Sequence, residues 1–315
     1  MKDVTIKIAV AGNVDSGKST LAGVLMSNKL DDGRGSCREL ILRTPHEKSS
    51  GRTSTISNNN VIHIDEKTQT RQIISLIDLA GHEKYLKTTI YGMTGYCIDY
   101  GLILVGANMG LTRMTKEHLG ILLYMKIPII VLMTKVDICP ENIFKATERK
   151  LRQILKLPLF NKRPYFFNLD EEKSLTEMDK FLSLPEPLNT FIPVIPMSNK
   201  TGVNLESVKK LLLSLQPRHT WPDKINGSIV YIDSTFNVKG IGLVISGTVR
   251  GKPINVNQKL WIGPYHGDFI PFKVRSLHNN VRENVESVSD TEVVCIAVRF
   301  TTKKTLSKEQ ILKGM

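Results

Sequence analysis

A glycine-rich stretch near the N-terminus, GNVDSGKST from Gly12 to Thr20, matches the pattern G-x-x-x-x-G-K-[ST]. Gly12 and Gly17 allow a tight backbone turn whose N–H groups can point at phosphates. Lys18 brings a positive charge to the β- and γ-phosphates, and the hydroxyl of Ser19 can ligate Mg²⁺. An apolar run precedes the stretch and a helical pattern follows it, so we predict a site for a nucleoside triphosphate with Mg²⁺. The expected contacts come from Asn13, Val14, Asp15, Ser16, Gly17, Lys18, Ser19 and Thr20.

Two later apolar runs end in residues that can select the base. In MTKVD, the carboxylate of Asp137 can accept hydrogen bonds from N1–H and N2–H₂ of guanine, a pair of donors that adenine lacks. In PMSNKTG, Ser198 and Asn199 can cover the O6 edge of the same base. Each motif ends a predicted strand, and open α/β sheets bind ligands beyond the carboxyl ends of their strands. The residues expected at the guanine of GTP or GDP are Thr134, Lys135, Asp137, Ser198, Asn199 and Lys200.

The stretch DLAGHEKY, which begins at Asp78, carries the candidate residues for hydrolysis. Asp78 can hold Mg²⁺ through water, and Gly81 lets a backbone N–H approach the γ-phosphate. Taken alone, His82 is better explained as a solvated turn residue. Its place after Asp78 and Gly81 favours a role in orienting the attacking water. A hydroxyl of TST (53–55), in the loop before this stretch, can complete the ligands of the metal.

The chain that must position these residues has 315 of them, too many for one ordinary core and enough for two domains. No run approaches the ~18 apolar residues of a membrane helix, and the N-terminus lacks the pattern of a secretory signal. Four cysteines without a CxxC pair predict free thiols in the cytoplasm rather than a zinc cluster. The net charge of +13 suggests a polyanionic partner such as RNA, with solubility and lysine-rich codon usage as the alternative explanation.

Residues 1–216 alternate short apolar runs with helical patterns, which predicts a doubly wound, mostly parallel α/β domain. With the phosphate and guanine motifs above, we expect this domain to be of the P-loop GTPase type. The predicted strands are 5–11, 60–66, 73–80, 100–107, 127–134 and 191–198, and the predicted helices are 18–29, 84–93, 114–126, 141–157 and 204–216. Residues 31–60 and 158–190 do not fit the alternation, and we expect them to be long loops.

Residues 217–227 are predicted to form a linker, and residues 228–315 a second domain. Short alternating segments at 228–236, 241–249, 259–264, 270–277 and 292–300 are separated by Gly, Pro and Asn, which predicts an all-β barrel. We expect Trp261 and Phe269 to pack inside the barrel, with a pocket for an aminoacyl or RNA end as the alternative.

Together, GNVDSGKST, GRTSTI, DLAGHEKYLKTT, TKVD and SNKTG resemble the translational GTPases related to elongation factor Tu. The segments DLAGHEKYLKTTIYGMTG, TRMTKEHLG and GRTS are most similar to the subfamily of GTP-binding proteins 1 and 2. GLVISGTVRGKPINVNQKLWIGP is similar to the second-domain β-barrel of that superfamily. The chain ends near the point where a third domain of the superfamily, which usually contacts tRNA, would begin, so we expect that domain to be absent from this chain.

The resemblance implies roles for individual residues. Thr55 is implied to be the switch I threonine that closes the metal site, Asp78 the second metal-binding carboxylate and His82 the residue that positions the attacking water. Val14 and Ile56 are implied to flank that histidine. Asp15 matches a position where related GTPases bind K⁺ or Na⁺, which we keep as a hypothesis.

The sequence departs from the pattern of the superfamily at a few positions. Thr134 replaces the commoner Asn, Ser16 replaces a His of the elongation factors, and RTSTI departs from R-G-I-T-I.

The function we predict is a switch that hydrolyses GTP to GDP and phosphate. Its expected partners are tRNA, the ribosome or another RNA, with an exchange or activating factor, and no membrane. We expect a cytoplasmic monomer. Two alternatives remain open: a GTPase subunit that powers a metabolic enzyme, and an RNA-binding scaffold that uses GTP as a structural ligand.

Overall fold

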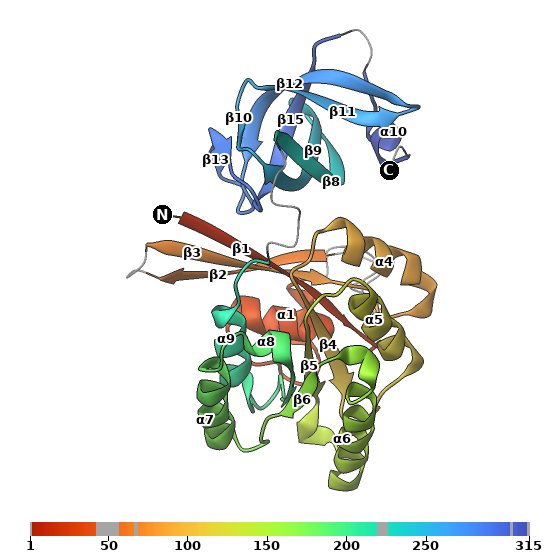
Figure 1. Cartoon of the computed structure of the whole chain (residues 1–315), viewed down its shortest axis with the longest axis vertical. Helices are drawn as coiled ribbons and strands as arrows, with labels where there is room; N and C mark the ends of the chain where they lie inside the picture. The colour runs from red at the N-terminus through yellow and green to blue at the C-terminus, as the bar shows by residue number, and fades with distance from the viewer. Residues whose placement is uncertain (1, 42–56, 66–68, 219–225, 303–304, 314–315) are drawn as a thin grey trace. The chain divides into compact units, whose positions relative to one another are not determined.

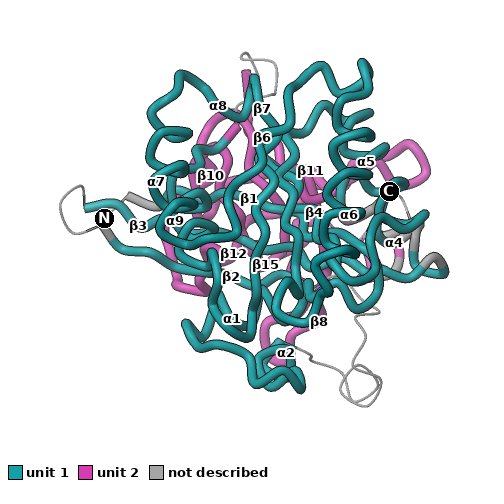
Figure 2. Tube along the Cα trace, turned by 90° about the horizontal axis from the view of Figure 1, so that it is seen from below, with its two compact units in different colours: residues 1–94, 98–217 teal, residues 95–97, 218–315 magenta. Residues whose placement is uncertain are grey.

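The computed structural model of the chain describes residues 2–41, 57–65, 69–218, 226–302 and 305–313. The chain divides into two compact units, residues 1–94 with 98–217, and residues 95–97 with 218–315 (Figure 2). Among the described residues, no helix is long and apolar enough to cross a membrane.

The first unit is built on a seven-stranded sheet with the strand order β2-β3-β1-β4-β5-β7-β6 (Figure 1). Neighbouring strands are parallel except β2 and β3, which pair antiparallel. The strands are β1 (Lys2–Gly12), β2 (Ser57–Asp65), β3 (Thr70–Asp78), β4 (Tyr100–Gly106), β5 (Ile129–Thr134), β6 (Arg163–Phe166) and β7 (Phe191–Pro196). The expected doubly wound, mostly parallel α/β domain is confirmed.

Helices cover both faces of this sheet. Helices α1, α7 and α9 share one apolar cluster with the sheet, and Figure 1 shows α4, α5 and α6 on the other side. The helices are α1 (Lys18–Ser27), α2 (Ser36–Glu39), α4 (Leu86–Gly95), α5 (Arg113–Tyr124), α6 (Glu141–Leu155), α7 (Glu171–Leu182), α8 (Pro187–Thr190) and α9 (Leu205–Ser214). Because the central strands are buried on both faces, Leu102, Ile103 and Leu104 are all fully buried in succession.

The register of the sheet brings the predicted motifs to one edge. Val10 pairs with Asp78, Gly12 with Leu104, and Met133 with Pro196. Since these strands are parallel, the segments that follow β1, β3, β5 and β7 emerge at the same edge of the sheet. The phosphate loop, DLAGHEKY, TKVD and SNK are therefore neighbours in space.

Residues 158–190 are not the long loop that we expected. They contain β6, α7 and α8, and Asp170 caps α7 by accepting a hydrogen bond from the backbone N–H of Lys173. Tyr165 and Phe181 anchor the segment to the core, with ring centroids 5.1 Å apart. The other unexpected element is α2, which lies within the predicted loop 31–60.

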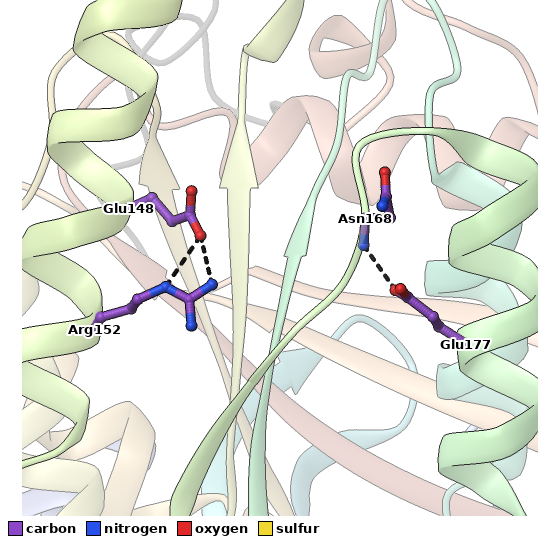
Figure 3. Close-up of polar contacts among 4 residues, drawn as sticks. All are labelled: Glu148, Arg152, Asn168 and Glu177. Carbon is purple, nitrogen blue, oxygen red and sulfur yellow. Dashed lines mark hydrogen bonds and ion pairs between the residues drawn. The ribbon is translucent and has the colours of Figure 1, made fainter.

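Figure 3 shows polar contacts of the helices that precede and follow β6. On α6, Arg152 donates two hydrogen bonds to Oε1 of Glu148, at 3.1 and 2.6 Å, and its guanidinium lies 3.8 Å from the ring centroid of Phe166. On α7, Glu177 accepts the backbone N–H of Asn168 at 2.8 Å. These contacts use the charged groups locally, so we interpret them as structural.

The second unit is an antiparallel β domain, as the alternating segments predicted. Its main sheet has the order β11-β12-β15-β9-β8, and β13 pairs with β12. The elements are β8 (Ser228–Val238), β9 (Gly242–Gly251), β10 (Ile254–Asn255), β11 (Lys259–Tyr265), β12 (Asp268–His278), β13 (Asn284–Val285), β14 (Ser287–Val288), β15 (Val293–Phe300) and α10 (Lys308–Lys313). An apolar cluster that includes Phe272 and Ile296 forms its core.

Trp261 and Phe269 do not pack inside this unit, so that expectation was wrong. Trp261 is 66% exposed and Phe269 is 59% exposed. The reason is the two-residue period of the strands: Ile262 of β11 and Ile270 of β12 are buried, which places the neighbouring aromatic side chains on the opposite face.

Candidate nucleotide site

The phosphate loop connects the end of β1 to the start of α1. Gly12 and Gly17 both have positive φ values, 144° and 86°, which a side chain at either position would disfavour. Within the loop, Ser16 Oγ donates to the carbonyl of Asn13 at 2.8 Å. Asp15, with φ of 59°, is exposed at the tip of the loop, and Val14 beside it is half-buried. The sequence therefore folds here into a cradle that opens on the N-terminus of α1.

Lys18 is the buried cation of this cradle. Its Nζ donates to the carbonyls of Asn13 at 2.7 Å and Gly12 at 3.3 Å. Burial lowers the pKa of the Lys18 ammonium, and the nearby carboxylates of Asp78 and Asp15 oppose that shift. A polyanion bound in the cradle would stabilise the charged form further, which is what a triphosphate offers.

Ser19 and Asp78 bring two side-chain oxygens together at the start of α1. Ser19 Oγ donates to Oδ2 of Asp78 at 2.6 Å, and Asp78 is fully buried at the end of β3. Mg²⁺ prefers oxygen ligands and binds through few protein groups together with phosphates and water. Two adjoining oxygen groups beside Lys18 fit that requirement. The described residues contain no cluster of three or more His, Cys, Asp or Glu side chains that would suit a metal held by protein alone.

Gly81 lies directly against the phosphate loop. A Cβ added there would be 2.5 Å from Lys18 Nζ and 2.8 Å from the carbonyl oxygen of Gly12. The segment around it is tied down, since Leu79 donates its N–H to Val10 at 3.1 Å and Thr89 Oγ1 donates to the carbonyl of Ala80 at 2.9 Å. A side chain at this position would therefore force the Lys18 ammonium or the backbone to move.

His82 follows Gly81 with its ring exposed. Its Nδ1 accepts the backbone N–H of Lys84 at 3.1 Å, so the neutral imidazole carries its proton on Nε2. Its ring also makes an edge contact with Tyr85, at 6.2 Å between centroids. The structure gives His82 no hydrogen bond to the phosphate loop.

Thr134 connects the phosphate loop to the strand that carries TKVD. Its hydroxyl is fully buried and lies 2.7 Å from the carbonyl oxygen of Ser16 and 3.4 Å from that of Val105. The hydroxyl donates to the backbone carbonyl of Ser16. With Thr instead of the commoner Asn at position 134, a hydroxyl rather than an amide makes this link to the phosphate loop.

Asp137 and Ser198 bring the two base motifs together. Ser198 Oγ donates to Oδ1 of Asp137 at 2.7 Å, and it accepts the backbone N–H groups of Lys200 and Thr201 at 3.2 and 3.1 Å. Lys135 takes the left-handed conformation with φ of 62°. The hydroxyl of Ser198 thus orients the carboxylate, whose second oxygen makes no hydrogen bond to another described residue.

A pocket of about 210 Å³ lies beside these residues. It is lined by Gly17, Thr20, Asp31, Gly33, Arg34, Gly35, Arg38, Lys135, Asp137, Ile138, Asn199 and Lys200. Asn199 Oδ1 is buried there and has no hydrogen-bond partner among the described residues. The pocket extends from the start of α1 to TKVD and SNK. Of the site residues predicted from the sequence, those that line it are Gly17, Thr20, Lys135, Asp137, Asn199 and Lys200.

The sequence did not single out one wall of this pocket. Asp31 donates its backbone N–H to the carbonyl of Asn199 at 3.0 Å, and its carboxylate accepts the N–H groups of Gly33, Gly35 and Cys37. These bonds hold the first part of the loop after α1 against the base motif. The signal in the sequence was the run DDGRG, whose aspartates and glycines are residues typical of turns.

A second residue missed from the sequence is His118 of α5. It is fully buried, and its Nδ1 accepts the backbone N–H of Gly12 at 3.1 Å. Burial, with a smaller effect of the Lys18 charge, lowers the pKa of His118 to about 4. The imidazole is therefore neutral near pH 7, as an acceptor must be.

Two predicted residues, Thr55 and Ile56, lie outside the described residues, so their proposed places at the metal and beside His82 stay predictions.

The family described as the elongation factor Tu GTP binding domain matches residues 3–218. GTP-binding protein 1 of Xenopus laevis is 37% identical over 98% of this chain and 49% of its own length. GTP-binding protein 2 of Homo sapiens is 35% identical over 87% of this chain and 48% of its own length.

A solved structure, translation elongation factor SelB from Methanococcus maripaludis with the GTP analogue GppNHp, is similar in fold. Its TM-score is 0.67 at 23% identity, over 98% of this chain and 54% of that one. The chain thus spans about half the length of the curated relatives it matches.

Proposed function

The chain belongs to the family that carries the elongation factor Tu GTP-binding domain, and from that membership we propose that it binds GTP and GDP with Mg²⁺ and hydrolyses GTP to GDP and phosphate. The observation that carries the proposal is the convergence at one sheet edge of Lys18, the Ser19–Asp78 pair and the Asp137–Ser198 pair. These groups match, in order, the phosphates, the metal and the base of one nucleotide.

Each group has a separate task in the proposed reaction. Lys18 and the N–H groups of the phosphate loop hold the β- and γ-phosphates, and Asp137 accepts from the guanine edge. Mg²⁺ at Ser19 and Asp78, with Thr55, would neutralise charge that develops on the phosphates. Gly81 presents its backbone N–H to the γ-phosphate. Nε2–H of His82 is available to hold the attacking water, because Nδ1 is occupied by Lys84.

Binding and turnover of GTP test the proposal. We expect the fluorescence of a labelled GDP to rise on mixing, to be displaced by GTP and not by ATP, and phosphate to be released slowly in multiple turnovers. Lys18→Ala should abolish the nucleotide signal. Lys150→Ala, at an exposed position on α6, is the matched control. Equal displacement by ATP and GTP would contradict the assignment of the base.

For the partner, we propose tRNA, the ribosome or another RNA, whose binding is controlled by the nucleotide. Three observations support an RNA partner: the net charge of +13, the membership in this family, and the likeness in fold to a translation elongation factor. We propose further that the chain acts in the cytoplasm as a monomer and that an exchange or activating factor assists it.

Stimulation experiments separate this role from the two alternatives. Ribosomes should raise multiple-turnover GTPase activity if the partner is the translation machinery. A GTPase subunit of a metabolic enzyme would respond to that enzyme and not to ribosomes. A scaffold that holds GTP as a structural ligand would show no turnover under any of these conditions.

A further inference from the structure

The outer face of β11, β12 and β15 in the second unit combines aromatic and basic side chains. It carries Lys259 and Trp261 from β11, Phe269, Pro271 and Lys273 from β12, and Arg299 from β15. Their neighbours along the strands, Ile262, Ile270, Phe272, Val274 and Val298, are buried in the core. We call this surface the basic–aromatic face.

The three cations of the basic–aromatic face form one row across three strands. Lys259 pairs with Lys273, and Lys273 pairs with Arg299, in the register of the sheet. Adjacent strands lie about 4.8 Å apart, so the row spans about 10 Å. Like charges directly opposite one another destabilise a sheet. The row therefore costs stability in the free protein, and a bound polyanion would remove that cost.

Nothing in these strands neutralises the row. Asp268 is the one acidic residue in β11, β12 and β15, and it lies beside the turn that joins β11 to β12. Within the described part of the chain, Lys259, Lys273 and Arg299 make no ion pair. Their positive charge faces solvent.

The aromatic side chains lie next to this row. Trp261 pairs with Pro271, one same-face step of about 7 Å along the strands from the Lys259–Lys273 pair. Phe269 is a further step along β12 and lies over Gly263, where an added Cβ would meet the Phe269 ring at 3.0 Å. Two large rings are thus held on a rigid sheet surface with most of their area exposed.

We propose that the basic–aromatic face binds single-stranded RNA, with Trp261 and Phe269 stacking on unpaired bases and Lys259, Lys273 and Arg299 contacting the phosphates. Exposed rings beside a track of cations are the two components by which proteins hold single strands. Sheet surfaces that carry aromatic side chains bind unstacked bases in the same manner. Double-stranded RNA buries the faces of its bases, so it offers the rings nothing to stack on.

This inference rests on the RNA-partner part of the proposed function and not on GTP hydrolysis. It adds the place of contact in the second unit and the single-stranded state of the RNA that is recognised. The neighbouring segments of a bound strand would extend beyond the face in both directions, since the cation row is only about 10 Å wide.

The test uses the full chain and a 12-nucleotide single-stranded RNA of mixed sequence, labelled at its 5′ end. The chain has two tryptophans, so Trp221→Phe leaves Trp261 as the sole tryptophan reporter. We expect RNA to quench the fluorescence of Trp261 and to raise the anisotropy of the label, and a duplex of the same sequence to do neither.

Two sets of variants separate stacking from charge. Trp261→Ala and Phe269→Ala should each weaken binding by about 5- to 100-fold, with little change in its salt dependence. The triple change Lys259→Gln, Lys273→Gln and Arg299→Gln should reduce the slope of log affinity against log salt by about two. The matched controls are Tyr124→Ala, an aromatic residue 90% exposed on the first unit, and the triple change Lys116→Gln, Lys150→Gln and Lys180→Gln.

Three results would overturn the proposal. The first is wild-type affinity in both sets of variants, and the second is equal binding of duplex and single strand. The third is a self-association that Trp261→Ala abolishes, which would assign the face to a second copy of the chain. GTP turnover is measured on the same variants and should be unchanged. A chain that turns over no GTP yet binds RNA through these residues would refute the proposed hydrolysis and leave this inference standing.

Discussion

The backbone N–H of Gly12 donates a hydrogen bond to Nδ1 of His118, 106 positions later in the chain, at 3.1 Å. The bond joins the first residue of the phosphate loop to the interior of α5. Both groups are buried, so losing the acceptor would leave a buried N–H unpaired, at a cost of about 1–3 kcal/mol. Protonation of the imidazole removes the acceptor as surely as a substitution does.

The stability of the first unit should therefore depend on pH through His118. Its folded-state pKa of about 4 lies below the ordinary value of 6.5. Above pH 6.5 the neutral ring is present in both states and the full stability remains. As the pH falls from 6.5 towards 4, only the unfolded chain takes up the proton, and the free energy of unfolding falls by about 1.4 kcal/mol per pH unit from this group. Urea unfolding at a series of pH values measures the slope.

His118→Asn is the matched control for that prediction, because an amide oxygen can accept from Gly12 but does not titrate. Between pH 6.5 and 4, the free energy of unfolding of His118→Asn should fall less steeply with pH than that of the wild type, by the contribution of one proton. His118→Phe should be destabilised at every pH. Parallel curves for the wild type and His118→Asn would show that His118 does not control this pH dependence.

A methyl group at Gly81 should disturb GTP more than GDP. The Cβ of alanine would come within 2.5 Å of Lys18 Nζ and 2.8 Å of Gly12 O, so the segment after β3 or the ammonium has to move. Overpacking of this kind costs about 1–3 kcal/mol. Since the N–H of Gly81 is proposed to meet the γ-phosphate, we expect Gly81→Ala to weaken GTP by roughly 10-fold and GDP by less, as measured by competition with a fluorescent nucleotide.

Gly120→Ala supplies the control, because nothing lies within 4 Å of a Cβ added at that helical glycine. It should leave nucleotide affinity unchanged and raise stability by up to about 1 kcal/mol. Equal losses of GTP and GDP affinity in Gly81→Ala would remove the proposed contact with the γ-phosphate.

The carboxylate of Asp137 should determine the choice of base. Asp137→Asn keeps an oxygen for Ser198 but replaces the second acceptor with an amide donor, which repels N2–H₂ of guanine and suits the C2 carbonyl of xanthine. We expect GTP affinity to fall by about 10- to 100-fold and XTP affinity to rise. Inosine triphosphate lacks the 2-amino group, so its affinity should differ less between the wild type and the variant than the affinity of GTP does. A variant that still prefers GTP to XTP would place the base elsewhere.

The sequence predicted those parts of the site whose pattern is local, and it missed those that depend on contacts between residues far apart in the chain. Local patterns were sufficient for the strand, turn and helix around the phosphate loop. They were also sufficient for β4 and β5, whose unbroken apolar runs reflect burial on both faces. His118 was beyond reach, because a lone histidine within a helix gives no sign that it meets Gly12, a partner fixed only by tertiary packing. The exposure of Trp261, in contrast, was present in the sequence: in KLWIGP and DFIPFKV the lysines alternate with the buried residues and share their face with the aromatic residues.

Residues 171–182 form a helix that the local sequence did not lead us to expect. Ser174, Met178 and Phe181 are buried with the spacing of a helix face, yet the surrounding charges and prolines suggested a loop. The tertiary cluster of Tyr165, Phe167 and Phe181 supplies the stability that local propensity lacks. Medium-range packing decided the structure of this segment.

The hypothesis of a monovalent cation at Asp15 predicts a dependence of turnover on the salt used. Asp15 is exposed at the tip of the phosphate loop and its charge acts on Lys18. We expect GTP hydrolysis to be several-fold faster in potassium chloride than in choline chloride of the same ionic strength, with sodium tested alongside. Asp15→Asn should remove the difference without straining the backbone, since asparagine tolerates the φ of 59° found here. Equal turnover of the wild type in potassium and choline would end the hypothesis.

His82 should be needed for hydrolysis and dispensable for binding. The ring is exposed, and within the described ranges it accepts a hydrogen bond from the N–H of Lys84 alone, so its removal opens no cavity and leaves the phosphate loop untouched. His82→Ala should bind GTP with wild-type affinity and hydrolyse it about 100- to 10,000-fold more slowly in single turnovers, the usual range for a lost proton-handling or water-positioning group. His63→Ala, an exposed histidine on β2, is the matched control and should hydrolyse GTP normally. Unchanged single-turnover hydrolysis in His82→Ala would return His82 to the role of a solvated turn residue, and the water would then have to be held by another group near Gly81.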